Sequence, residues 1–171
     1  MPAREWRIDE VTDETPDLVE AVRELFTEYH GWLGEVVCSQ RLAEEIAALP
    51  GVYAPPAGRL LLARAADGTP AGVVGIRPFE ADVCEMKRLY VQPGARGAGL
   101  GRLLAERAIA AARELGYAEI RLTTLPGAMD PALAMYRRMG FVETEAFTDH
   151  SHVERGVDIT FMRLPLSSQR R

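Results

Sequence analysis

The chain is poor in cysteine and in long hydrophobic runs. Its two cysteines, Cys38 and Cys84, lie far apart and form no C-x-x-C pattern, so their spacing offers no zinc or dithiol site. Two buried free thiols are the favoured interpretation, and a disulfide between them is the alternative. No run approaches the about 18 apolar residues of a membrane span, and the first residues lack the apolar core of a secretory signal. We therefore expect a cytoplasmic protein.

The composition is that of a soluble globular chain. Its 171 residues are 47% hydrophobic, which suits one well-filled core, so we expect a single domain over 1–171. The core should span about 5–165, with a flexible tail at 166–171. The formal net charge of −5 argues against binding to nucleic acid or to an anionic membrane, and it fits a cationic amine substrate.

Hydrophobic periodicity and turn residues divide the chain into alternating elements. Helices are predicted at 16–33, 38–49, 100–115 and 131–139. Strands are predicted at 6–11, 59–66, 71–79, 83–91, 118–125, 141–147 and 158–164. The pattern indicates a chain in which strands and helices form one mixed α+β structure.

The most informative segment is Arg96-Gly97-Ala98-Gly99-Leu100-Gly101-Arg102, between the strand at 83–91 and the helix at 100–115. Its glycines let the backbone turn sharply and approach a ligand, and the helix that follows starts with unpaired N–H groups. These features predict a site for a phosphate or pyrophosphate, flanked by two arginines. The spacing fits neither the dinucleotide fingerprint nor the Walker A loop. The alternative is a glycine-rich turn that merely joins strand to helix.

The spacing R-x-x-G-x-G, read as Arg96, Gly99 and Gly101, resembles the signature of the GCN5-related N-acetyltransferases, the GNAT family. The order of predicted elements resembles that family over nearly the whole chain. The resemblance implies an α+β fold of three layers (α/β/α), with a mixed, mostly antiparallel twisted sheet of about seven strands and about four helices. It also implies that acetyl-CoA is the cosubstrate, with its pyrophosphate on the glycine loop.

The resemblance extends to the strand before the loop. In the family this strand splays from its neighbour, so Leu89 N–H would meet the thioester carbonyl and Val91 would pair with the pantetheine arm. An N–H aimed at that oxygen stabilises the charge that develops during attack. The alternative is an ordinary ladder strand. The implied cofactor-binding residues are Leu89, Tyr90, Val91, Arg96, Gly97, Ala98, Gly99, Leu100, Gly101 and Arg102.

Tyr136 matches the tyrosine that protonates the departing thiolate in many family members, because Ala132, Met135, Gly140 and Phe141 fill the positions of the family pattern around it. A phenol is protonated at neutral pH and can donate to a thiolate. The alternative is that Tyr136 only packs the helix. The chain departs from the pattern at Met129, where many relatives have an asparagine that contacts the cofactor.

Glu85 is the candidate general base, four residues before Leu89, because an attacking amine must lose a proton. It could equally pair with Lys87 or Arg88 or be solvated, with a chain of water molecules as the base. His150 and His152 form an H-x-H pattern without further ligands, so we expect no metal.

These features predict a transferase that moves the acetyl group of acetyl-CoA to a primary amine of a small molecule or peptide. The amine attacks directly in a ternary complex, and neither cysteine takes part. A non-catalytic acyl-CoA sensor of the same fold is the alternative function. A nucleotide ligand or a longer acyl donor is a further alternative, and the resemblance admits a homodimer.

Overall fold

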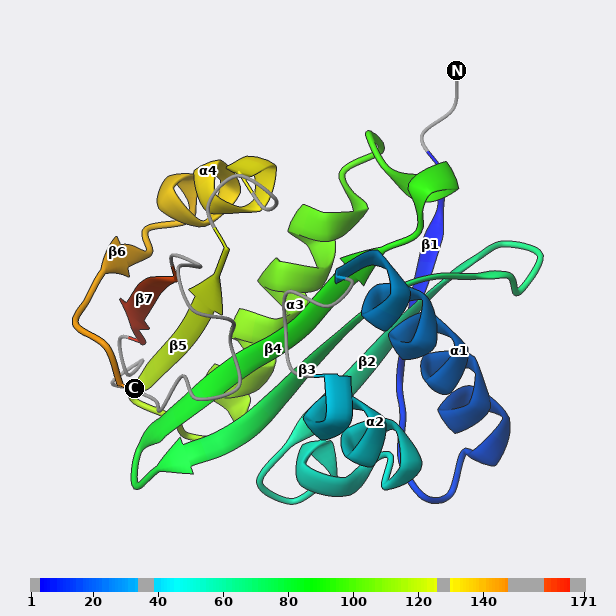
Figure 1. Cartoon of the computed structure of the whole chain (residues 1–171), viewed down its shortest axis with the longest axis horizontal. Coiled ribbons are helices and arrows are strands. Elements are labelled where there is room, and N and C mark those ends of the chain that lie inside the picture. The colour runs from blue at the N-terminus through cyan, green and yellow to red at the C-terminus, as the bar shows by residue number, and fades with distance from the viewer. Residues whose placement is uncertain (1–3, 34–38, 126–129, 148–158, 167–171) are drawn as a thin grey trace.

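A computed structural model describes residues 4–33, 39–125, 130–147 and 159–166. These residues form a seven-stranded sheet in the order β1-β2-β3-β4-β5-β7-β6 (Figure 1). The strands are β1 (Trp6–Glu10), β2 (Arg59–Ala65), β3 (Pro70–Glu80), β4 (Val83–Val91), β5 (Glu119–Thr124), β6 (Val142–Glu143) and β7 (Thr160–Pro165). The α-helices are α1 (Pro16–Leu33), α2 (Ser39–Ala47), α3 (Leu100–Glu114) and α4 (Asp130–Arg138). Neighbouring strands are antiparallel except β4 and β5, so the predicted mixed sheet is confirmed.

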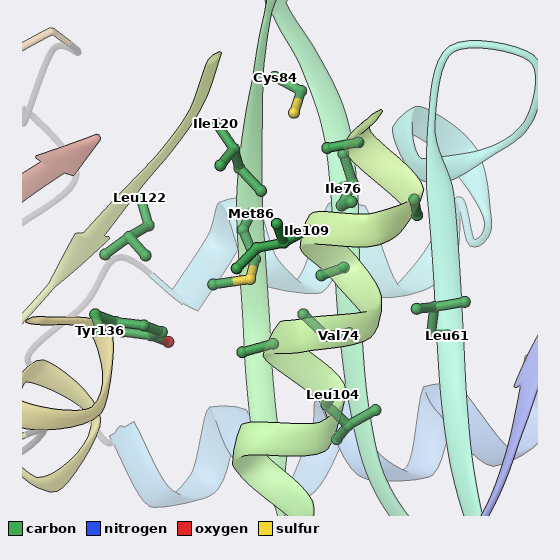
Figure 2. Close-up of a cluster of buried hydrophobic side chains, with 14 of the residues drawn as sticks. Leu61, Val74, Ile76, Cys84, Met86, Leu104, Ile109, Ile120, Leu122 and Tyr136 are labelled. Carbon is green, nitrogen blue, oxygen red and sulfur yellow. The ribbon is translucent and has the colours of Figure 1, made fainter. Parts of the chain in front are cut away.

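Helices cover both faces of the sheet, and each face has its own hydrophobic core. On one face the helices α1 and α2 supply Val22, Leu25, Phe26 and Leu42, which pack with Leu60, Leu62 and Val73. On the other face α3 and α4 supply Leu104, Ala108 and Tyr136, which pack with Val74, Ile76 and Met86. Figure 2 shows α3 in front of the strands and the N-terminal helices behind them. The three predicted layers are therefore present.

The helix α3 begins and ends as its sequence predicts. Leu100, Leu104 and Ala108 recur at helical spacing and are buried against the sheet. Gly99 stands before the first turn with a φ of 77°, and Gly116 follows the last turn with a φ of 86°. Both conformations are strained for other residues, so the two glycines set where the helix starts and where it stops.

The C-terminal part of the sheet differs from the prediction in two places. The strand predicted at 141–147 is reduced to the two residues of β6, because Phe141 turns into the core and is 2% exposed. The tail predicted from residue 166 is wrong at its first residue. Leu166 is 6% exposed, and its N–H donates to Ala118 O at 2.7 Å. Burial of an apolar side chain and a backbone hydrogen bond thus hold the chain beyond β7.

The parallel pair β4 and β5 separates after three residue pairs. Val83, Cys84 and Glu85 pair with residues 119–121, and the two strands diverge beyond that point (Figure 1). The edge of β4 that faces β5 therefore has no neighbouring strand from Met86 to Val91 within the described structure. This opening in the sheet positions the candidate site.

Candidate active site

A cleft of about 830 Å³ opens where β4 and β5 separate. Its walls come from β4, the glycine-rich segment, α3, the end of β5 and α4. Nine of the ten predicted cofactor-binding residues line it: Leu89, Tyr90, Val91, Arg96, Gly97, Gly99, Leu100, Gly101 and Arg102. Ala98 is exposed and does not belong to the lining. The fold thus gathers the segment with the strongest sequence signal around one cavity.

The glycine-rich segment turns sharply into α3. Gly97 and Gly99 have φ values of 80° and 77°, in the left-handed region that favours glycine. The first helical hydrogen bond runs from Leu103 N to Gly99 O, at 3.0 Å. The N–H groups of the preceding helical residues have no acceptor within the helix, and the helix dipole places partial positive charge on them. The segment has the geometry of an anion site.

Two arginines flank this anion site with different degrees of restraint. Arg96 donates from Nε to Val91 O at 3.0 Å, and its guanidinium lies 5.9 Å from the rings of both Trp32 and Tyr90. Arg102 pairs with Glu106 at 2.8 Å on the exposed surface of α3. A surface pair of this kind contributes little, about 0–1 kcal/mol, so Arg102 is available to an anion at small cost.

The backbone of β4 presents polar groups to the cleft. Gln92 N–H donates to Ala71 O of β3, so Gln92 faces that strand. Successive residues of a strand direct their backbone groups to opposite edges, so those of Val91 and Leu89 point away from β3, toward the cleft. The contact between Val91 O and Arg96 agrees with this direction. Both residues have the orientation that a ligand lying along β4 would require.

A β-bulge interrupts β4 just before Leu89. β3 advances two residues from Val73 to Gly75 while β4 advances three from Tyr90 to Lys87, so β4 holds one extra residue. Arg88 accommodates it with a φ of 61°, the only positive φ of a non-glycine residue in the described chain. Such a conformation costs on the order of 1 kcal/mol or more and persists only where neighbouring contacts enforce it.

The enforcing contacts come from α2 and the segment that follows it. Arg88 donates from Nε to Glu45 at 2.7 Å, and the Tyr53 hydroxyl donates to the other carboxylate oxygen at 2.6 Å. The side chains of Arg88 and Glu45 are 13% and 14% exposed. Burial raises the pKa of Tyr53 well above its usual value, and the negative charge of Glu45 adds to the rise. The phenol therefore stays protonated and keeps its hydrogen bond.

Tyr136 reaches the cleft from α4. Its ring is 6% exposed and packs edge-on against Phe141, with 5.6 Å between ring centroids. In Figure 2 its hydroxyl points from α4 toward β4. Burial raises the pKa of Tyr136 well above its usual value, with a smaller contribution from Tyr29 across the cleft. The phenol is accordingly a proton donor rather than an acceptor at neutral pH.

Glu85, the predicted base, lies outside this arrangement. It is 2% exposed, accepts a hydrogen bond from Arg77 Nε at 2.9 Å and lies 3.9 Å from Lys87 Nζ. It is not among the residues that line the cleft. The structure thus brings Tyr136 and the glycine-rich segment together but places Glu85 in an ion pair beneath the site.

The cleft also contains residues that have no role in the sequence-based site, among them Tyr29, Lys87 and Arg88. Of these three residues only Lys87 stands out in the sequence, because it is the only lysine among the 20 lysines and arginines. Nothing in the sequence marks Arg88, because its ion-pair partner Glu45 is 43 positions away and no glycine occupies the bulge. Trp32 also lines the cleft and is 46% exposed.

Other sequence features lie apart from the cleft. Cys84 is a free, buried thiol whose pKa is raised to about 12 by desolvation. His150, His152, Cys38 and Met129 fall outside the described residues. Within the described ranges no group of three or more His, Cys, Asp or Glu residues could hold a metal ion. In the same ranges, every helix falls short of the length and apolarity that crossing a membrane demands.

Comparisons with known proteins define the class to which this fold belongs. A GNAT-family acetyltransferase from Staphylococcus aureus Mu50 superimposes with a TM-score of 0.77 at 17% identity, covering 95% of this chain and all of that one. The yncA protein of Salmonella typhimurium, solved with acetyl-CoA, gives a TM-score of 0.67 at 23% identity, covering 98% of this chain and 97% of that one. The fold is that of the GNAT acyltransferases.

The sequence places the chain within the family itself. The profile of the acetyltransferase (GNAT) family matches residues 19–141. An uncharacterized N-acetyltransferase of Schizosaccharomyces pombe is 36% identical over 153 residues, which cover 89% of this chain and 91% of that protein. The protein belongs to the GNAT acetyltransferase family, as the sequence predicts.

Proposed function

We propose that the protein transfers the acetyl group of acetyl-CoA to a primary amine by direct attack in a ternary complex. The observation that carries the proposal is the single cleft that contains an anion-binding helix start, an unpaired strand edge and a buried phenol. The helix start would bind the phosphates of the cosubstrate, and the strand edge would bind its amide-bearing arm. The phenol would lie beside the leaving sulfur. The solved yncA structure with acetyl-CoA supports this choice of ligand.

Different residues along the cleft bind different parts of the cosubstrate. The N–H groups at the start of α3, with Arg96 and Arg102, bind the pyrophosphate. The edge of β4 aligns the arm, and Leu89 N–H donates to the thioester oxygen as negative charge develops there, an effect often worth about 3 kcal/mol. Ala98 contributes through its backbone alone, since it lies outside the lining.

The chemical step needs one proton donor and one proton acceptor. The neutral amine attacks the carbonyl carbon, the carbon–sulfur bond breaks and an amide forms. Tyr136 stays protonated at neutral pH because burial raises its pKa. It gives its phenolic proton to the thiolate as negative charge develops on the sulfur, and it regains a proton from water before the next turnover. The amine loses its proton to water, because Glu85 is held by Arg77 outside the cleft.

Calorimetric titration with acetyl-CoA tests the first half of the proposal. We expect micromolar binding that Arg96→Ala weakens at least tenfold, because Arg96 is the phosphate ligand nearest the strand edge. Arg107→Ala is the matched control, since Arg107 is exposed on α3 and does not line the cleft. Absence of binding by the intact protein would mean that the glycine-rich segment is only a turn that joins the strand to the helix.

Release of free CoA thiol in the presence of primary amines tests the second half. Turnover that Tyr136→Phe abolishes, with acetyl-CoA still bound, is the result expected of the enzyme. Tight acetyl-CoA binding without turnover across a broad amine panel would instead favour a sensor of acyl-CoA. Competition by CoA but not by ATP or NAD would separate acetyl-CoA from a nucleotide ligand.

A further inference from the structure

A pair of cations lies on β4 ahead of the glycine-rich segment. Lys87 and Arg88 both line the cleft, and their side chains are 22% and 13% exposed. A regular strand would direct two consecutive side chains to opposite faces of the sheet. The bulge at Arg88 removes that constraint, and the charges of Arg88 and Glu45 both act on Lys87. Both cations therefore line the same cleft.

The ion pairs around these residues leave one positive charge in excess. Arg88 pairs with Glu45 at 2.7 Å and Arg77 pairs with Glu85 at 2.9 Å. Lys87 Nζ lies 3.9 Å from the Glu85 oxygen that already accepts from Arg77. Within the described structure, three cations thus share two carboxylates. Desolvation and the neighbouring charge of Arg88 lower the pKa of Lys87 to about 8, as expected where positive charge is in excess.

Cosubstrate phosphates do not account for these two cations. Arg88 reaches toward α2, on the face covered by α1 and α2, whereas the glycine-rich segment leads into α3 on the opposite face. Three residues of strand separate Arg88 from Val91, a distance of about 10 Å before the loop begins. Both cations also precede Leu89, the residue proposed to contact the thioester oxygen. They lie on the acceptor side of the reaction.

We propose that the acceptor is an amine that also carries a carboxylate, as an α-amino acid does, and that Lys87 and Arg88 bind this carboxylate. The proposal rests on the acetyl transfer proposed above. Arg88 engages Glu45 through Nε, and it also hydrogen-bonds to the Tyr29 hydroxyl. Among the described residues, its two terminal nitrogens have no carboxylate partner. A guanidinium presents paired donors that match a carboxylate, and Lys87 adds a point charge beside it. A polyamine would bring further positive charge to a site that already has an excess.

Arg88 is pre-positioned for this role. Its guanidinium is held by Glu45, and Glu45 is held in turn by the hydroxyl of Tyr53, which is fully buried. A ligand carboxylate would therefore meet a donor that needs no rearrangement. Held groups bind with less loss of conformational freedom than mobile ones. The strained backbone of Arg88 is consistent with a residue placed for a ligand.

The test compares amino acids with the amines that lack their carboxylate. The pairs are L-phenylalanine with phenethylamine, L-leucine with isoamylamine and L-methionine with 3-(methylthio)propylamine, assayed by release of CoA thiol. We expect kcat/KM at least tenfold higher for the carboxylate-bearing member of each pair that is turned over. Equal or lower kcat/KM for the acids, or turnover of none of them by protein that binds acetyl-CoA, would overturn the proposal.

Substitution of Lys87 tests whether this residue causes the preference for carboxylate-bearing amines. Lys87→Met keeps an unbranched side chain of nearly the same length and removes its charge, and it should reduce the ratio of kcat/KM between acid and amine at least threefold. Arg107→Met removes a charge from the exposed face of α3 and should leave the ratio unchanged. A ratio that Lys87→Met does not move would overturn the assignment of Lys87. Calorimetry with acetyl-CoA is run on each protein, so that loss of cosubstrate binding, which would refute the proposed function, is seen separately.

Discussion

Gly75 on β3 lies against the ring of Tyr53, and the packing there leaves no room for a side chain. A Cβ at this position would lie 2.6 Å from Cδ1 and 2.7 Å from Cε1 of Tyr53. Carbon atoms in contact are normally about 3.5–4.0 Å apart, so Gly75→Ala would push the ring by about 1 Å. The substitution therefore tests how firmly Tyr53 is held.

The surroundings of Tyr53 oppose such a movement. The residue is 0% exposed, meets Phe26 edge-on with 6.2 Å between centroids, and donates to Glu45 at 2.6 Å. Overpacking of this kind costs about 1–3 kcal/mol, and loss of the hydrogen bond to Glu45 adds about 1 kcal/mol. We expect Gly75→Ala to lower the free energy of unfolding by about 2–4 kcal/mol.

Urea denaturation at 25 °C measures this loss, and a thermal melt should show a fall of roughly 4–16 °C. Gly31→Ala in α1 is the matched control, because no atom lies within 4 Å of the added Cβ. Alanine is favoured over glycine within a helix by up to about 1 kcal/mol, so the control should be neutral or stabilised. A Gly75→Ala protein within about 0.5 kcal/mol of the wild type, the range of ordinary surface changes, would refute the reasoning.

Three further predictions address the site. Tyr136→Phe should lower kcat by about 100-fold or more while calorimetry shows unchanged acetyl-CoA affinity, and an unchanged kcat would contradict the role of proton donor. Glu85→Gln should lower the free energy of unfolding by about 2–4 kcal/mol, since it leaves Arg77 unpaired, but should keep the shape of the kcat/KM pH profile. A lost pH-dependent limb would restore Glu85 as the base. Lys87 has a pKa of about 8 in the folded protein against its usual 10.5, so the unfolded chain binds more protons between these values. Stability due to this group should rise from pH 8 to 10.5, and urea titrations of Lys87→Met should lack that rise.

Much of the fold could be predicted from local patterns. The buried faces of α1 and α3 repeat at helical spacing, and glycines stand at both ends of α3, so residues close in sequence define these helices. The strand at 141–147 could not be delimited in the same way. Whether Phe141 continues a strand or turns inward depends on the core that α3 and α4 build around it. The anchoring of Leu166 likewise depends on Ala118, which lies just before β5 and is distant in sequence.

The candidate site likewise has one part that local sequence patterns predict and another part that they do not. The glycine-rich segment and Tyr136 carry their signals within a few residues, because a helix start and a helix face are local structures. The ion pair of Arg88 with Glu45 joins residues 43 positions apart, and the bulge that permits it lacks the glycine that would mark it. Glu85 could be weighed against Lys87 and Arg88 as partners, but its nearest cation, Arg77, comes from across the β-ladder. Pairing across strands is a property of the assembled sheet.

The two cores on opposite faces of the sheet give the two ends of the cleft separate supports. The glycine-rich segment rests on α3, whereas Arg88 is held from α2 through Glu45. The sheet stands between these supports, so a substitution in α2 can alter the surroundings of Arg88 and leave the start of α3, the proposed phosphate site, unchanged. Under the proposed function, the acceptor half of the cleft can therefore change while the half that binds the acetyl donor stays the same.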